Sequence, residues 1–531
     1  MSFIIKSRSK RRPLGLDEPL RHGSHKKPVT RRDFLAQGFL TGAATVVAPG
    51  MLGTLLHTRS AAAAGTLSQD IEDLKAQAIC NITGGAGKIP FICFDLAGGA
   101  NIAGSNVLVG KRGGQLDFLT TQGYSKLGLP GDMLPSNPTF INTEFGLAFH
   151  SDSAFLRGMQ ARTSVATRAN VNGAVIPARS ENDTGNNPHN PMYGIARTGA
   201  RGELLTLIGS QNSDSGGNSI APATLMDPAN RPTKVDRSSD VTGLVDTGEV
   251  ASILDPEDTV RVLETMARIS KSKVGLNVGS AYDENGTVST RLPAANDDID
   301  VRKRMLCGYV KTADTVNTFG TPGELDPAQD PEITAIFGNN FGGDREFEKT
   351  AAVMKLVIPG YAGAGTISSG GFDYHTGDRA VGEDRDFRIG QCMGACLEYA
   401  ARRGKPLMLY VFSDGSVSSG GMVDSSARGR GKGVWTSDNQ QTAASFFLVY
   451  NPVARPVLMS QTSQQLGYFR PDGDVETASS PAANNVNLLV QTVLLNYMAL
   501  HGETNDFIGK FGNALGPRAA LDGLVAFQPI V

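Results

Sequence analysis

The chain has 531 residues, with 50 lysines and arginines against 52 aspartates and glutamates. Residues 1–64 hold 11 of the basic and three of the acidic side chains, so residues 65–531 hold 39 against 49 and carry a net charge near −10. This acidic body excludes the basic footprint of a nucleic-acid-binding protein. After residue 64 no apolar run approaches the roughly 20 residues of a transmembrane span, so none is expected in the mature chain.

Residues 1–64 have the pattern of a twin-arginine signal peptide. Arg31 and Arg32 precede Asp-Phe-Leu, a weakly apolar and Gly-containing run continues to Leu56, and four alanines end at Ala64. We predict export by the twin-arginine translocase into the periplasm or out of the cell. That route carries folded proteins, often with a metal or cofactor already loaded. The sequence leaves open whether the leader is removed after Ala64 or retained.

Strands and helices alternate along the remaining chain, residues 65–531. Strands are predicted at 88–96, 203–208, 366–367, 406–412 and 444–450, and helices at 67–78, 258–271, 299–316, 344–356, 384–403 and 485–500. Residues 97–200 are expected to be mostly Gly-rich loop, and about 210–355 to be a loop-rich and then helical insertion. The alternation predicts an α/β domain with a mainly parallel sheet covered on both faces.

Acidic side chains follow three of the predicted strands. Asp95 lies at the end of the first, Asp414 directly follows the most apolar one, and Asp373 follows 366–367 with His375 two residues later. In open α/β sheets ligands gather beyond the carboxyl ends of the strands. Carboxylates and an imidazole at this edge predict a divalent metal, with zinc, calcium and magnesium left open. An aspartate at a strand end also commonly caps the following helix.

The other candidate groups lie in loops. His189 lies in a Gly/Asn-rich loop and is a further candidate metal ligand, although a loop histidine is more often simply hydrogen-bonded. Among the five cysteines, a Cys80–Cys93 bridge is left open, and Cys392 and Cys396 are expected to be small buried residues on one helix face.

The leader and the strand-end motifs together resemble one known family. An apolar strand ending in a Gly-Gly loop, residues 370–375 (Gly-Gly-Phe-Asp-Tyr-His), a helix and a strand ending Val-Phe-Ser-Asp-Gly resemble the domain of unknown function 1501 family. Its members are exported proteins related in fold to alkaline phosphatases and sulfatases. The resemblance spans about Ile89 to Tyr450 and implies a three-layer α/β/α sandwich, a metal site at the strand ends and a small phosphate or sulfate ester as substrate.

The chain also departs from the pattern of that family. The first loop, residues 98–106, lacks the family's acid, Pro188 stands where a serine nucleophile is expected, and residues 431–438 lack the late histidine. Ser105 remains the candidate nucleophile. Two functions are therefore left open: a metal-dependent hydrolase using Asp95, Asp373, His375 and Asp414, or a non-catalytic envelope or secretion-associated protein that retains the fold.

Overall fold

The computed structural model describes residues 67–76, 80, 87–180, 187–245, 254–274, 296–319 and 322–531. The predicted leader lies outside these ranges. The chain divides into two compact units: a larger one made of Glu72–Val245 and Phe319–Val531, and a smaller one made of Met1–Ile71 and Asp246–Thr318. The expected insertion, about 210–355, contributes residues to both units.

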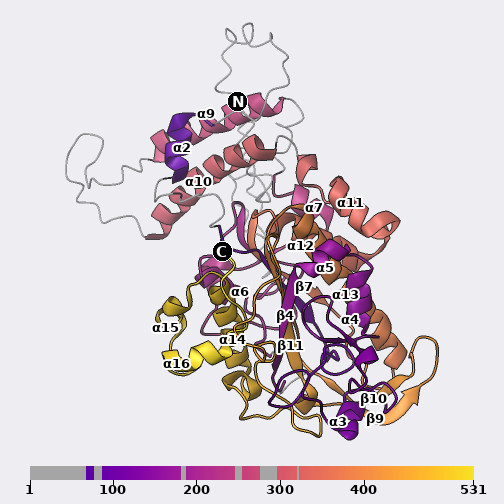
Figure 1. Cartoon of the computed structure of the whole chain (residues 1–531). Helices are drawn as coiled ribbons and strands as arrows, with labels where there is room; N and C mark the ends of the chain where they lie inside the picture. The colour runs from indigo at the N-terminus through magenta and orange to yellow at the C-terminus, as the bar shows by residue number, and fades with distance from the viewer. Residues whose placement is uncertain are drawn as a thin grey trace, which may run out of the picture. The chain divides into compact units, whose positions relative to one another are not determined.

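A seven-stranded sheet forms the centre of the larger unit (Figure 1). In spatial order its strands are β4 (Val171–Pro177), β11 (Ala444–Tyr450), β8 (Leu407–Ser413), β1 (Phe91–Leu96), β7 (Ala362–Ser369), β5 (Leu205–Gly209) and β6 (Thr233–Lys234). β1 runs parallel to both β7 and β8, whereas β11 is antiparallel to β8 and β4. The predicted α/β class with a mainly parallel sheet is confirmed.

Helices cover both faces of this sheet, which explains why β1 and β8 are continuous apolar runs. Phe94 of β1 belongs to one buried core, and its neighbour Cys93 belongs to the other. The first core includes side chains of α4 (Ala154–Gln160), α7 (Ser238–Thr242), α11 (Pro331–Phe337), α12 (Arg345–Val357) and α13 (Arg379–Arg402). The second includes side chains of α6 (Met192–Arg197), α14 (Val486–Leu500), α15 (Phe507–Phe511) and α16 (Arg518–Leu521).

Several helices begin where a side chain caps them. The carboxylate of Asp344 accepts a hydrogen bond from the backbone N–H of Glu346 at the start of α12, at 2.9 Å. The side chain of Asn485 does the same for Asn487 at the start of α14, at 3.0 Å. Such caps satisfy backbone donors that the first helical turn leaves without intrahelical partners.

Residues 97–200, predicted to be mostly loop, contain more regular structure than expected. They hold β4, α4 and α6 together with α3 (Thr121–Lys126), α5 (Val165–Ala169) and the two-residue strands β2 (Ile141–Asn142) and β3 (Phe149–His150). A second unpredicted feature is an antiparallel hairpin of β9 (Val417–Asp424) and β10 (Lys432–Asp438). Its polar, Gly-containing and partly exposed strands lack the apolar run that reveals a buried strand.

The smaller unit is helical where the structure describes it. It contains α9 (Pro256–Val274), most of α10 (Asn296–Phe319) and the first turn of α2 (Gln69–Ala76). Arg268 of α9 forms two hydrogen bonds with the carboxylate of Asp70, at 2.7 and 2.8 Å. None of the helices within the described ranges combines the length and apolar character that crossing a membrane requires.

The cysteines differ in their bonding. Cys93, Cys392 and Cys396 are free and buried, as expected for the last two. Cys80 and Cys307 are disulfide-bonded. The Cys80–Cys93 bridge that the sequence left open is therefore not formed, because Cys93 lies inside the central strand and contacts the Thr366 hydroxyl at 3.3 Å.

Candidate metal centre

The segment that follows β7 presents two of the predicted ligands on its outer side. Exposed and buried positions alternate along it, so that Phe372 and Tyr374 enter the core while Asp373 and His375 face outward. The Tyr374 hydroxyl accepts a hydrogen bond from the backbone N–H of Asn101 at 2.7 Å and donates one to Asp386 at 3.1 Å. These contacts fix the buried side of the segment and so hold Asp373 and His375 on its outer side.

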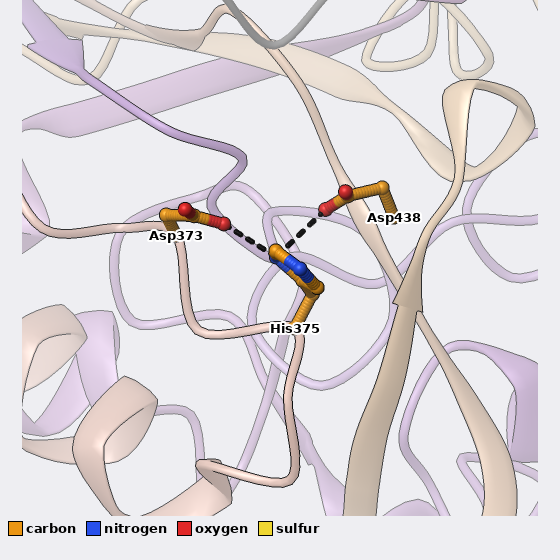
Figure 2. Close-up of side chains that lie close together, drawn as sticks. All are labelled: Asp373, His375 and Asp438. Carbon is orange, nitrogen blue, oxygen red and sulfur yellow. Dashed lines mark ion pairs between the residues drawn. The ribbon is translucent and has the colours of Figure 1, made fainter.

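Asp373, His375 and Asp438 come together at this point (Figure 2). One ligand atom from each lies within 4.8 Å of the others. Nδ1 of His375 forms ion-pair contacts with Oδ1 of Asp373 and, at 3.1 Å, with Oδ1 of Asp438. This nitrogen is buried yet makes no hydrogen bond of acceptable geometry. Carboxylates and an imidazole are ligand types that zinc and other divalent cations take in proteins.

The hairpin brings Asp438 to the other two residues. Asp438 is the last residue of β10 and pairs with Val417 at the start of β9. The backbone N–H of Gly377 donates to the carbonyl of Trp435 at 2.8 Å and so ties β10 to the segment that carries His375. Sequence reasoning missed Asp438, although it lies in the segment 431–438 where the family resemblance placed a late site motif. That segment lacks the histidine that the family resemblance leads one to expect, so Asp438 was not recognised as a candidate ligand.

A buried charged cluster fixes β10 against α13, the helix that follows the site segment. Lys432 at the start of β10 contacts the carboxylate of Glu383 at 2.8 Å, and Arg379 contacts the same carboxylate at 2.6 Å. The Arg379 guanidinium also lies over the ring of Trp435, 4.7 Å from its centroid. Burial raises the pKa of Glu383, but the nearby cations outweigh it and lower that pKa overall. The hairpin is therefore held by paired internal charges.

Asp95 lies elsewhere, inside the sheet edge. It is fully buried, and its carboxylate accepts hydrogen bonds from the backbone N–H groups of Asn218 and Ser219, at 2.6 and 2.8 Å, and from the Ser219 hydroxyl at 3.1 Å. Burial is the largest influence on Asp95 and raises its pKa. The carboxylate anchors the loop after β5, and it does not belong to the three-residue group.

Asp414 is not a member of the three-residue group either. It is buried, and its two carboxylate oxygens accept hydrogen bonds from the backbone N–H of Gly98 at 2.7 Å and from the side-chain amide of Asn218 at 3.2 Å. Gly98 approaches Asp373 so closely that a Cβ atom on it would lie 2.5 Å from the backbone nitrogen of Asp373. The structure thus brings Asp373 and His375 together but not the expected set of four, because Asp95 and Asp414 are occupied in holding loops.

His189 and Ser105 are both enclosed in the protein. His189 stacks on Phe412, with 5.8 Å between the ring centroids, and its Nε2 lies 3.2 Å from the Ser180 hydroxyl. Burial lowers the pKa of His189 to about 3. Ser105 is 1% exposed, donates to the side-chain oxygen of Asn101 and accepts a hydrogen bond from Arg379 at 3.1 Å. Neither residue is part of the three-residue group.

The chemical capacity of the site follows from its donors and its position. Two carboxylates and one imidazole offer three ligands to a divalent cation, and their exposure at the carboxyl edge of the sheet leaves room for a ligand from solvent. Comparison of the chain with protein-family models, with curated proteins and with solved structures gives no match.

Proposed function

We propose that this protein is an exported metal-dependent hydrolase that cleaves a phosphate or sulfate ester in the periplasm or outside the cell. The convergence of Asp373, His375 and Asp438 carries the proposal. Three protein ligands with further coordination positions open to solvent are typical of catalytic metal sites. The bound cation would stabilise negative charge that develops on the ester oxygens. The imidazole ligand favours zinc over magnesium or calcium.

The family resemblance and the export route remain part of the same proposal. The mainly parallel sheet and the helices on both of its faces support a three-layer, alkaline phosphatase-like fold. The twin-arginine pattern of residues 1–64 supports export. The disulfide bonding of Cys80 and Cys307 fits an oxidising compartment.

Metal analysis of the full chain tests the proposal directly. We expect bound metal in protein purified from its native compartment, and Zn²⁺ affinity at least tenfold weaker in His375→Ala and Asp438→Asn. Asp378→Asn is the matched control, because Asp378 is exposed in the same region but lies outside the three-residue group. Equal Zn²⁺ affinity in all four proteins would overturn the metal site.

Ester turnover tests the catalytic part. We expect the metal-loaded protein to cleave an aryl phosphate or an aryl sulfate, and His375→Ala to lose that activity together with its metal. Turnover that persists unchanged in His375→Ala would reject the assigned site.

A non-catalytic envelope or secretion-associated protein is the second candidate. The burial of Ser105 favours it, because the hydroxyl of this candidate nucleophile is enclosed in the protein and donates a hydrogen bond to the side-chain oxygen of Asn101. Metal binding without turnover of either ester class would support this second function.

A further inference from the structure

An arginine of α13 reaches back over the segment that carries Asp373 and His375. The NH1 group of Arg385 donates a hydrogen bond to the carbonyl of Gly370 at 3.0 Å. Its guanidinium lies where a side chain on Gly371 would stand, since a Cβ atom there would be 2.5 Å from Cζ of Arg385. Gly371 also has a φ of +86°, a conformation that favours glycine. The missing side chain at Gly371 therefore leaves a defined space that the Arg385 guanidinium fills.

Gly371, against which this guanidinium packs, precedes the candidate ligand Asp373 by two residues. Gly371 and Asp373 are both exposed, while Phe372 between them is buried.

Arg385 has no ion-pair partner in the described part of the chain, and its hydrogen-bond partner is a neutral carbonyl. The neighbouring arginine Arg388, by contrast, is paired with Asp344 at 3.3 Å, and Arg428 is paired with Asp384. A guanidinium with free donors beside a metal site suits a planar two-point contact with phosphate or sulfate oxygens.

We infer that Arg385 binds the anionic group of the substrate and positions it against the cation held by Asp373, His375 and Asp438. The inference rests on the proposed function and deepens it by naming the side chain that selects a tetrahedral oxyanion. Arg385 acts together with Gly371, which leaves the space that the guanidinium occupies.

Anion binding to the metal-loaded full chain tests this role. Inorganic phosphate and inorganic sulfate are titrated calorimetrically into Zn²⁺-loaded wild type, Arg385→Gln, Arg385→Lys and Arg388→Gln, and the zinc content of each sample is measured. We expect Arg385→Gln to retain its zinc and to bind the preferred anion at least tenfold more weakly. Arg385→Lys should recover part of the affinity, because it keeps the charge and loses the planar fork. Arg388→Gln removes the same charge from the same helix and should bind like wild type.

The possible results distinguish a failure of this inference from a failure of the proposed function. Equal anion affinity in wild type and Arg385→Gln, with zinc retained in both, overturns the role of Arg385 and leaves the metal site standing. Zinc-loaded wild type that binds neither anion overturns the inference in the same way. A wild type that binds no zinc overturns the proposed function and, with it, the inference.

Discussion

Asp386 offers a test of the packing beneath the site. It lies on α13, is 4% exposed, and accepts hydrogen bonds from the side-chain amide of Asn106 at 2.7 Å and from Tyr374 at 3.1 Å. Burial, and after it the charge of Glu383, raises the pKa of Asp386 to about 7 from its ordinary 3.8. A difference of about three pKa units corresponds to roughly 4 kcal/mol of folding free energy.

The direction in which stability changes with pH follows from the pH values at which the folded and unfolded chains release the Asp386 proton. The unfolded chain releases it near pH 4 and the folded protein near pH 7, so between these values the folded state binds more protons and stability falls as the pH rises. Asp386→Asn removes this dependence. It also costs about 1 kcal/mol at every pH, because the amide nitrogen that replaces one carboxylate oxygen cannot accept the hydrogen bond that the Tyr374 hydroxyl donates. We expect the variant to be about 0.5 kcal/mol less stable than wild type at pH 4, where the unfolded wild-type chain already releases part of the proton, and about 3 kcal/mol more stable at pH 8.

Urea unfolding at intervals from pH 4 to pH 8 measures this difference. Trp435 is the chain's sole tryptophan and is buried close to the site, so its fluorescence follows unfolding of this region. Asp384→Asn is the control, because it makes the same substitution two residues away on the same helix at an exposed position. A difference between Asp386→Asn and wild type that changes by less than about 1 kcal/mol across the range would refute the reasoning.

Three further substitutions have defined expectations. Ser105→Ala removes the acceptor of an Arg379 hydrogen bond and should lower the unfolding free energy by about 1–2 kcal/mol with ester turnover unchanged; a hundredfold loss of turnover in folded protein would restore Ser105 as the nucleophile. Asp95→Asn leaves backbone donors of the loop after β5 without a charged acceptor and should cost about 2–3 kcal/mol by urea unfolding; a cost below 0.5 kcal/mol, taken as about the limit for surface changes, would contradict this. Gly371→Ala should displace the Arg385 guanidinium and weaken phosphate binding as Arg385→Gln does. Unchanged phosphate affinity would show that Arg385 does not depend on the space at Gly371.

The sequence predicted those strands that are buried on both faces. β1, β8 and β11 are continuous apolar runs, and their predicted bounds fall within a few residues of the observed ones. β7 was predicted only as 366–367, because its Ala-Gly-Ala-Gly start carries too little apolar surface to give a pattern. β4 was missed for a similar reason, since Asn172 and Gly173 interrupt its apolar residues.

The candidate site was predictable only in its local part. Asp373 and His375 lie two residues apart, so the alternation of a single segment places them together. Asp438 comes more than 60 positions later, and the hairpin that delivers it depends on Lys432, Glu383 and Arg379 pairing inside the protein. Asp95 and Asp414 were expected to join them because each lies at the carboxyl end of a predicted strand, but each carboxylate is held by amide donors of adjacent loops.

The order of the strands along the chain has a consequence for folding during synthesis. The central strand β1 is made early, yet both of its partners, β7 and β8, lie about 270 and 317 positions further along the chain. At ribosomal rates of about 5–20 residues per second, roughly 15–60 s pass between synthesis of β1 and of β8. For that time β1 (Phe91–Leu96) lacks at least one of the two strands with which it pairs. We therefore expect nascent chains to depend on chaperones until β8 has been synthesised.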